Sequence, residues 1–488
     1  MPRTRRQFLR QAAGVTIGGV AATSLARCGA GGVPTVPGGP STRPGNALRL
    51  PPDLFGPLLE AASGQAEVWP GRRASLLTFG GAYPSPTIRV ARGGALSVRL
   101  ANRLGEPTNV HWHGLTSPAD MDGFPTDLLP PGVSRDFAVP ILERAGTYWY
   151  HPHSDGQTAR QVYLGMAGFL IVEDAAEAGL GLPADERDVP LLLQDRRSSP
   201  DGSIAYAPTV MDLLSGYLGD VALVNGTPEA FLSVSASLYR LRLLNGANAR
   251  VFRIGFSDGR TFHVIGTDGG LLERPVPATY ADMGPGERLE ILVDFSAMAA
   301  GSSVSLRSLP FRVTGGMGMG MMGGGGTQGA EMDLLRFDVD RPGSASPPPE
   351  RLVTADLPDP AGAVARRTFA LQMSMPPFAG GFLINGRSFA ADRIDFRARR
   401  DATELWDVSN PSTEPHPFHV HAARLRVLER SAGAPAVTDL GSKDTVLVWP
   451  GETVRMAVRF GPWPGRYVLH CHNLEHEDAG MMSAFEIV

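Results

Sequence analysis

Leu469 to Met482 read LHCHNLEHEDAGMM, and this segment decides how the rest of the sequence is interpreted. Successive residues of a β-strand point to opposite faces, so in a strand His470 and His472 share one face and Cys471 lies on the other. One short segment therefore supplies side chains to two different places.

The Cys471 side carries the donors of a soft metal site. Cys471, His476 and Met481 offer a thiolate, an imidazole and a thioether. A mononuclear blue copper site uses this set together with a second histidine. The second histidine must come from elsewhere in the chain, and His416 is the candidate because it lies apart from the paired histidines around it.

Histidines are concentrated in four short clusters. Ten of the eleven histidines fall in these clusters, and only His263 lies outside them. A single His-x-His pair indicates little, but four clusters, one of them split by Cys471, indicate metal binding. The paired histidines are His111 and His113, His151 and His153, His419 and His421, and His470 and His472.

The four clusters resemble the copper signatures of the multicopper oxidases, and most closely the bacterial three-domain laccases and cuprous oxidases. The resemblance runs from about Ala47 onward and includes residues 146–153 and 443–446 between and around the motifs. It implies four copper ions: one type 1, one type 2 and two type 3. The implied ligands are His416, Cys471, His476 and Met481 for type 1, His111 and His419 for type 2, and His113, His151, His153, His421, His470 and His472 for the type 3 pair.

The same resemblance implies the reaction. A reducing substrate gives up one electron at a time at the type 1 copper, and the three-copper cluster reduces O2 to water with four electrons. Cys471 is the expected electron path, since its backbone neighbours are His470 and His472. Glu477 and Asp122 match positions where relatives place carboxylates that deliver protons, although both could instead be solvated surface acids. Asp444 is a candidate partner for a ligand imidazole.

Composition limits the alternatives. The 488 residues are too many for one ordinary core and predict several domains. A net charge of −4 with scattered Lys and Arg does not indicate a nucleic acid or an anionic membrane surface as partner. Of the two cysteines, Cys28 lies in a predicted export signal, so no disulfide is expected within the folded body and Cys471 is free to bind metal.

The N-terminal residues predict export. Arg5 and Arg6, followed by a mildly apolar run from Ala12 to Ala26, resemble a twin-arginine signal over residues 1–30, with a linker at 31–46. The expected location is therefore the periplasm or another exported site, reached through the twin-arginine machinery. Cys28 could carry a lipid, although Arg27 beside it argues against this, or it could simply end a soluble signal.

The rest of the chain predicts an all-β fold with an internal repeat. Short β-branched segments are bounded by Gly, Pro and Asn. Asn102 precedes His111 by nine residues and Asn410 precedes His419 by nine, so the two ends of the chain are copies of one domain. The middle third keeps the frame but has Ile254 and Phe256 in place of ligands, and we expect it to act as a spacer and partial wall. The resemblance makes each copy a cupredoxin-like Greek-key β-sandwich, with domains at 47–178, 187–342 and 366–488.

The substrate is less well defined. Residues 315–326 form a Gly-rich loop that carries Met317, Met319, Met321 and Met322, soft donors suited to Cu(I) or incidental residues in a flexible loop. The expected reductants are organic compounds (phenols and aromatic amines), Cu(I), or both of these classes. We expect the protein to be a monomer. The alternatives are a copper-resistance or copper-storage protein with Cu(I) as main substrate, a metal-free relative such as a cell-division scaffold, and a copper nitrite reductase, which the three domains and eight cluster histidines disfavour.

Overall fold

The computed structural model describes residues 45–199, 201–313, 326–373 and 381–488. The predicted export signal, Cys28, most of the linker and the methionines of the 315–326 loop lie outside these described residues. No helix within the described ranges is long and apolar enough to cross a membrane.

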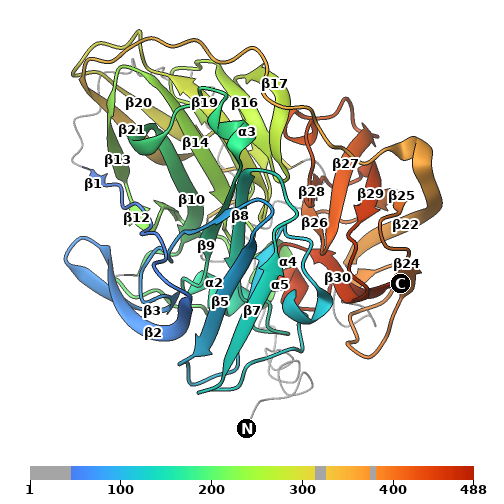
Figure 1. Ribbon diagram of the computed structural model, residues 1–488. Coiled ribbons are helices and arrows are strands. Elements are labelled where there is room, and N and C mark those ends of the chain that lie inside the picture. Colours follow the sequence, from blue (N-terminus) through green and yellow to red (C-terminus); the bar gives the residue numbers. More distant parts are fainter. Residues whose placement is uncertain (1–44, 200, 314–325, 374–380) are drawn as a thin grey trace, which may run out of the picture. The chain divides into compact units, whose positions relative to one another are not determined.

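Six β-sheets fall into three pairs along the chain (Figure 1). The first pair, called here the first copy, has the orders β3-β2-β5-β7 and β4-β9-β8-β6. The second copy has the orders β1-β13-β21-β20-β15-β18 and β12-β11-β10-β14-β19-β16-β17. The third copy has the orders β23-β22-β25-β29-β27 and β24-β31-β30-β26-β28.

The bounds of the strands are as follows. In the first copy they are β2 (Leu58–Trp69), β3 (Arg72–Phe79), β4 (Ile88–Ala91), β5 (Ala95–Asn102), β6 (His111–His113), β7 (Ser134–Pro140), β8 (Gly146–His151) and β9 (Gly168–Glu173). In the second they are β1 (Asn46–Ala47), β10 (Asp188–Arg196), β11 (Val221–Val224), β12 (Thr227–Pro228), β13 (Ala230–Ser235), β14 (Leu238–Asn245), β15 (Phe252–Phe256), β16 (Phe262–Thr267), β17 (Gly270–Ala278), β18 (Tyr280–Met283), β19 (Arg288–Asp294), β20 (Ser303–Ser308) and β21 (Met332–Arg341). In the third they are β22 (Ala363–Met373), β23 (Phe382–Ile384), β24 (Phe396–Ala398), β25 (Thr403–Ser409), β26 (His416–Val420), β27 (Ala423–Arg430), β28 (Thr445–Val448), β29 (Thr453–Phe460), β30 (Gly465–Cys471) and β31 (Met482–Ile487).

The helices are short. They are α2 (Thr158–Tyr163), α3 (Ala175–Ala178), α4 (Val210–Ser215) and α5 (Leu474–Asp478), with 3₁₀ turns η1 (Ala119–Met121), η2 (Asp185–Arg187), η4 (Pro360–Gly362) and η5 (Val437–Asp439). Sequence patterns show brief helical periodicity at residues 158–163 and 211–217, where α2 and α4 form. They did not predict α5, in which the Asn473 side chain accepts a hydrogen bond from the His476 backbone N–H and so caps the helix.

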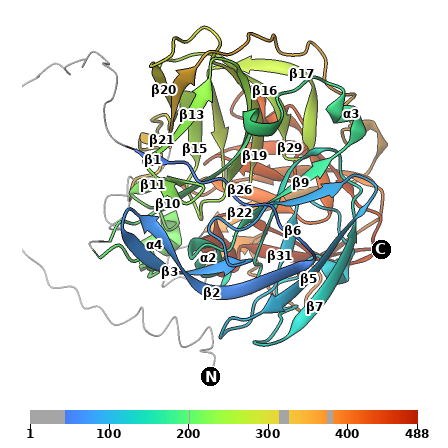
Figure 2. The ribbon, with the colours of Figure 1, turned by 60° about the vertical axis from the view of Figure 1, so that its left-hand side comes forward.

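Strand pairing confirms the internal repeat. Each copy contains the same run of three neighbouring strands, in which the first and second are parallel and the second and third are antiparallel. These runs are β2-β5-β7, β10-β14-β19 and β22-β25-β29. The all-β fold of three sandwiches is therefore the one predicted. The domain boundaries stay predictions, and β1 pairs in parallel with β13, beside which it lies in Figure 2.

An asparagine closes the same turn in every copy. The Asn102 side-chain N–H groups donate to the carbonyls of Glu106 and Leu129. Asn245 and Asn410 make the corresponding pair of bonds in the second and third copies, at 2.8–3.0 Å. The side-chain amide of asparagine has two N–H donors and so bonds two backbone carbonyls of the turn at once, which explains why asparagine recurs at this point.

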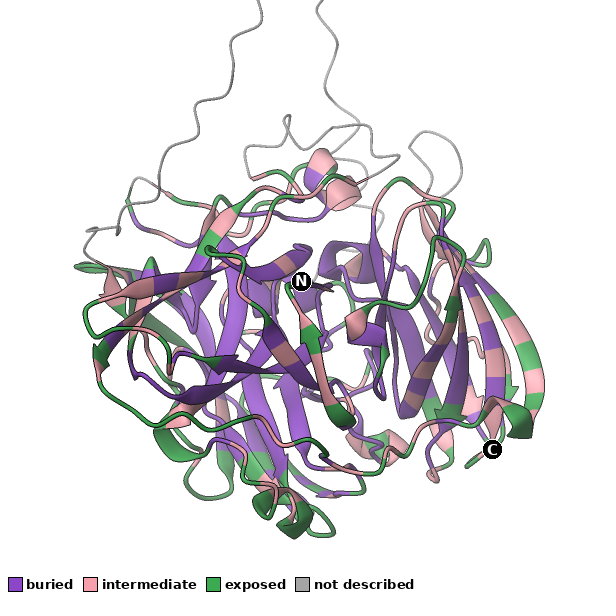
Figure 3. Ribbon diagram, turned by 90° about the horizontal axis from the view of Figure 1, so that it is seen from above, coloured by how far each residue is buried: buried purple, intermediate pink, exposed green. Residues whose placement is uncertain are grey.

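Each copy has its own hydrophobic core. One cluster of buried side chains lies in the first copy around Leu100 and Trp112, one in the second around Leu241 and Phe337, and one in the third around Trp406. Buried residues follow the strands, and exposed residues are concentrated in the connections and outer strands (Figure 3). Strands β6, β8, β26 and β30, which carry most of the histidines, belong to these rigid sandwiches.

Candidate metal centre

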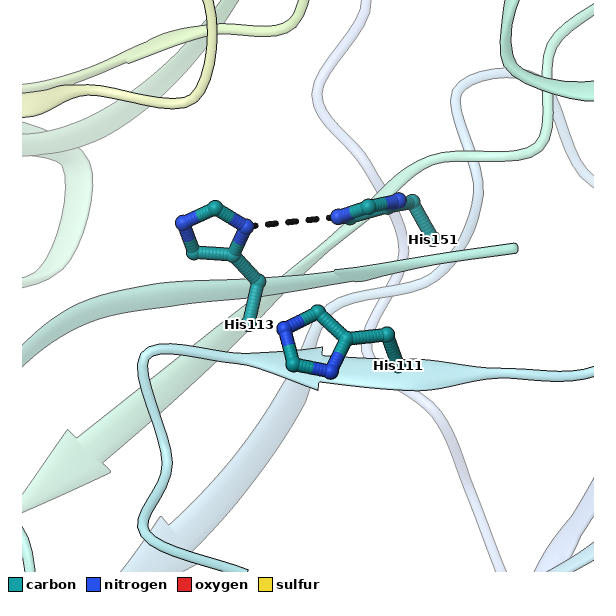
Figure 4. A group of neighbouring side chains, drawn as sticks. All are labelled: His111, His113 and His151. Atoms are coloured by element: carbon teal, nitrogen blue, oxygen red, sulfur yellow. Dashed lines mark hydrogen bonds between the residues drawn. The ribbon is translucent and has the colours of Figure 1, made fainter. Parts of the chain in front are cut away.

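The first copy presents histidines on two paired strands. In the register of β6 and β8, His111 lies opposite His151 and His113 lies opposite Trp149. His111 and His113 share one face, while Trp112 between them packs into the hydrophobic core. Figure 4 shows the three imidazoles gathered in one place, with His113 Nδ1 3.3 Å from His151 Nε2. His153 follows two residues after His151, just past the end of β8.

The third copy repeats this arrangement. In the register of β26 and β30, His419 lies opposite His470 and Phe418 lies opposite Cys471. His421 follows just past the end of β26, as His153 follows β8. The alternation of faces predicted from sequence is thus confirmed, because Phe418 and Cys471 face the core of the copy while the histidines face away from it.

The two sets of histidines meet. His111 Nε2 lies 3.4 Å from His419 Nε2, and His153 Nε2 lies 3.1 Å from His470 Nε2. The His113 ring stacks on the His419 ring with centroids 3.8 Å apart. Residues some 300 positions apart in sequence therefore form one cluster that draws on both outer copies.

Hydrogen bonds determine which ring nitrogen is free. An imidazole N–H that donates to an oxygen leaves the other nitrogen as a lone pair for a metal. In five of the histidines Nδ1 has an oxygen partner and Nε2 faces other imidazoles. These partners are the Asp122 carbonyl for His111 (2.7 Å), the Asp444 carbonyl for His419 (2.9 Å), the Pro152 carbonyl for His151 (2.8 Å), Asp122 Oδ2 for His421 (2.6 Å) and the Cys471 carbonyl for His470 (3.2 Å).

Within the cluster the histidines form several overlapping groups. Ring nitrogens of His153, His421 and His470 lie within 4.8 Å of one another. His113 and His151 form a second group, and the His472 ring lies 5.0 Å from His113 and 5.3 Å from His151. Neither nitrogen of the buried His472 has a hydrogen-bond partner within the described residues. A buried imidazole without partners is costly unless a ligand binds it, so this observation fits a bound metal ion.

Burial keeps these imidazoles neutral. It lowers the pKa of His151 to about 3 and that of His153 to about 4, and it holds the pKa of His111, His113 and His421 well below the ordinary value. Desolvation disfavours the charged form of a histidine. The neutral form is the one that binds metals, so the cluster is prepared for cations.

A second group lies on the other face of β30. His416 Nδ1 is 3.3 Å from Cys471 Sγ, which is 3.7 Å from His476 Nδ1. The two Nδ1 atoms are 3.2 Å apart, and all three residues are buried. Burial raises the pKa of the Cys471 thiol, so a cation is needed to hold the thiolate in this place.

Oxygen partners orient these two histidines as well. His416 Nε2 lies 2.8 Å from Ser412 Oγ, and His476 Nε2 lies 3.0 Å from the carbonyl of Leu214 in α4. Leu214 belongs to the second copy, which the sequence predicted to be only a spacer and wall. Met481 is buried beside the group, and its carbonyl accepts from the Cys471 backbone N–H at 3.0 Å.

The two candidate proton carriers both contact histidines of both outer copies. Asp122 accepts from His421 through Oδ2 and from His111 through its carbonyl. Glu477 lies 3.6 Å from His153 Nδ1 and 3.2 Å from His470 Nδ1. Asp122 Oδ1 and Glu477 Oε2 are buried and have no hydrogen-bond partner among the described residues.

The two carboxyls differ in their electrostatics. Burial raises the pKa of Asp122 well above its usual value. Burial would also raise the pKa of Glu477, but the adjacent His153 and His470 outweigh it and bring the pKa to about 2. Both side chains are buried, so the reading of them as solvated surface acids is wrong.

Sequence reasoning missed the partners that the second copy supplies. Asp444 contacts His113 as suspected, with Oδ1 3.0 Å from Nε2. The unexpected residue is Arg288 of β19, a buried side chain that donates to both Asp444 oxygens. No local pattern signals this pair, because 156 positions separate the two residues.

Comparisons with known proteins agree with this geometry. Family models described as multicopper oxidase match residues 60–177 and 358–488. A laccase of Bacillus stratosphericus is 32% identical over 478 residues, covering 85% of this chain and 91% of the relative. The structure of a laccase-like multicopper oxidase, CueO, from Ochrobactrum sp. superimposes with a TM-score of 0.80 at 36% identity, covering 90% of this chain and 100% of that one.

Another relative has a different kind of name. The cell division protein FtsP of Sodalis glossinidius is 33% identical over 428 residues and covers 86% of each chain. A cell-division name, which corresponds to one alternative considered from sequence, therefore occurs among the relatives. The close approach of nine buried histidines and one cysteine, in groups that could hold metal ions, favours the oxidases over that alternative.

Proposed function

This chain belongs to the multicopper oxidase family, and from that premise we propose how its own residues divide the work of a copper-dependent oxidoreductase that uses O2. Its substrates are a reductant and O2, and its cofactors are copper ions. We assign His416, Cys471, His476 and Met481 to a type 1 site. We assign His111 and His419 to a type 2 site, and two triads, His113 with His151 and His472, and His153 with His421 and His470, to a type 3 pair. Bound copper in these sites supplies one-electron transfer and a place where O2 accepts four electrons.

The single observation that supports this division is the pair of faces of β30. Cys471 contacts the His416 and His476 group, while His470 contacts His153 and His421 on the opposite side. Covalent bonds of one peptide segment therefore join the two groups. Electrons can pass between the two groups along this segment, so the reductant needs no direct contact with O2.

Asp122 and Glu477 are the proposed proton carriers. A proton can be held beside the ligands on Asp122 Oδ1, which has no hydrogen-bond partner among the described residues, and on the Glu477 carboxyl, whose Oε2 lies 3.2 Å from His470 Nδ1. The other oxygen of Asp122 orients His421, which holds this carboxyl in place. Two carriers beside the cluster suit a reaction that consumes four protons for each O2.

We propose phenols and aromatic amines as reductants, because electron removal at a distance requires only access and potential, and Cu(I) as a further substrate. The soft methionines of residues 315–326 support Cu(I), and a copper-resistance role with little organic oxidation is the alternative. We further propose export by the twin-arginine route to the periplasm, supported by Arg5 and Arg6, and action as a monomer.

The proposal is tested by loading the purified protein with copper and measuring bound metal, visible absorbance and O2 uptake together. We expect about four copper ions per chain and a band near roughly 600 nm from the thiolate-copper pair. O2 uptake with a phenol or with Cu(I) should follow. A colourless protein, or one that binds far fewer ions, would refute the assignment.

The substrate class is tested by replacing Met317, Met319, Met321 and Met322 with Ser. A loss of Cu(I) oxidation with unchanged phenol oxidation supports the role of the loop. Equal rates for both substrates in variant and wild type would exclude that role while leaving the oxidase assignment in place.

A further inference from the structure

Arg288 joins all three copies through one side chain. It lies at the start of β19 in the second copy and is fully buried. Its guanidinium donates to the Thr147 carbonyl in the first copy, to the Gly286 and Asp268 carbonyls in the second, and to both carboxylate oxygens of Asp444 in the third. A guanidinium has five N–H donors, and every one of them is used here.

Asp444, which Arg288 holds, in turn contacts two of the proposed ligands. Its Oδ1 lies 3.0 Å from His113 Nε2, and its carbonyl lies 2.9 Å from His419 Nδ1. An ionised carboxylate only accepts hydrogen bonds, so His113 must carry its proton on Nε2. The free nitrogen of His113 is then Nδ1, which is the atom that faces His151 Nε2 at 3.3 Å.

His113 thus differs from the five histidines whose Nδ1 has an oxygen partner. Its ring presents Nδ1 to the cluster, whereas theirs present Nε2. Without a fixed acceptor at Nε2, a neutral imidazole could carry its proton on either nitrogen. Asp444 is that acceptor, and Arg288 holds Asp444 in place by donating to both of its carboxylate oxygens.

The Arg288–Asp444 pair is closely packed against its surroundings. A Cβ atom at Gly114, the residue after His113, would lie 2.7 Å from an Arg288 nitrogen and 2.8 Å from Asp444 Oδ2. Gly286, whose carbonyl accepts from Arg288, has a φ of +86° and approaches the His472 ring so closely that a Cβ would lie 3.0 Å from it. The second copy therefore packs closely against the His472 ring and against Gly114, the residue after His113.

We propose that Arg288 is a positioning residue for copper binding, which acts through Asp444 to hold His113 in the tautomer with Nδ1 free. The second copy thereby completes the cluster even though it contributes no ligand to it. This inference rests on the ligand set proposed above. Outer partners of metal-bound imidazoles typically change metal affinity 10–100-fold when they are removed, and we expect a loss of about that size here.

The test compares Arg288→Lys with Arg250→Lys. Arg250 is a matched control, since it is also buried, also belongs to the second copy and also pairs with a carboxylate, that of Asp195. Its hydrogen bonds and ion pairs among the described residues include no histidine. Both variants keep the positive charge and lose the fork of donors. We expect Arg288→Lys to lose copper from the cluster about 10–100 times more readily in chelator titrations, with the band near roughly 600 nm unchanged per chain. Arg250→Lys should retain copper as the wild type does.

Asp444→Asn tests whether Arg288 acts on His113 through Asp444. An amide presents an N–H where Arg288 or His113 needs an acceptor, so this variant should weaken copper binding as Arg288→Lys does. The double variant should be no worse than either single change, because both break the same chain of contacts. In metal-free protein with ¹⁵N-labelled histidine, the His113 resonances, assigned with His113→Gln, should shift from the Nε2–H form toward the Nδ1–H form in each variant.

Three results would overturn the inference. They are equal copper retention in Arg288→Lys and Arg250→Lys, additive losses in the double variant, and an unchanged His113 tautomer. A wild-type protein that binds no copper would instead refute the proposed function, so the two failures can be told apart.

Discussion

The second copy and the two outer copies share a frame but not a chemistry. Asn102, Asn245 and Asn410 close the same turn with the same pair of bonds. In the register of β15 and β20, Ile254 lies opposite Ser308, where the outer copies pair His111 with His151 and His419 with His470. The frame therefore does not depend on metal binding.

The difference shows that the second copy contributes contacts with the outer copies and no metal ligands. It packs Ile254 and Phe256 into its core and places charged residues at its edge toward the third copy. Lys443 of the third copy lies 3.0 Å from Asp268 and 2.9 Å from Glu287, close to the Arg288–Asp444 pair. A network of buried charges that satisfy one another holds two domains in one register, and the metal cluster depends on that register.

The largest effect should come from Cys471→Ser, which removes the feature that distinguishes the third copy from the first. Serine oxygen is a poor replacement for the soft thiolate. O2 uptake should fall to the level of metal-free protein, and the visible band should vanish. Bound copper should drop by about one ion out of roughly four, because the cluster histidines remain. Loss of all copper would show that the two groups are not separate sites.

Next in size are Asp122→Asn and Glu477→Gln, which keep shape and remove a proton carrier. A positioned acid or base typically contributes about 10²–10⁴-fold to a rate. We expect O2 uptake to fall within that range while the visible band persists. Glu475→Gln is a nearby control, since Glu475 is also buried in α5 but bonds Tyr206, Tyr217 and Asn248 of the second copy. Wild-type turnover in both test variants would exclude proton delivery by these residues.

Phe256→His asks whether the frame alone can make a metal site. The new imidazole would lie at the position equivalent to His113. It would be surrounded by apolar side chains of the second copy's core instead of by other histidines. We expect no additional copper and a loss of about 3–5 kcal/mol in the free energy of unfolding, the cost typical of truncating a buried phenylalanine. Denaturant unfolding and metal analysis measure both. An extra bound copper would contradict the explanation given for the empty second copy.

The smallest effect concerns pH and the metal-free protein. His151 and His153 have pKa values of about 3 and about 4 in the folded chain, below the unfolded value of about 6.5. The unfolded chain therefore binds more protons, and stability is lost as the pH falls from about 6.5 toward 4, by up to about 1.4 kcal/mol per unit for each histidine. Chemical denaturation across this window should show the decline, and His151→Gln should flatten it. A midpoint independent of pH would contradict burial of neutral imidazoles.

Short-range patterns gave the strands, the repeat and the opposite faces of Cys471 and its neighbours, because strand geometry has a period of two residues. They also gave every histidine that the structure brings together. The N–H partners of those histidines, such as the Leu214 carbonyl and the Arg288–Asp444 pair, come from contacts across copies. No periodicity encodes such contacts. Helix α5 was missed because five residues are too few to show helical spacing.

The central claim is that both outer copies enclose one copper cluster, connected through Cys471 to a further copper. Anomalous diffraction at the copper edge from crystals of the copper-loaded protein tests this most directly. We expect one peak among His416, Cys471 and His476, and three peaks between the outer copies beside His111, His113 and His153. Peaks confined to a single copy, or no density between His111 and His419, would contradict it.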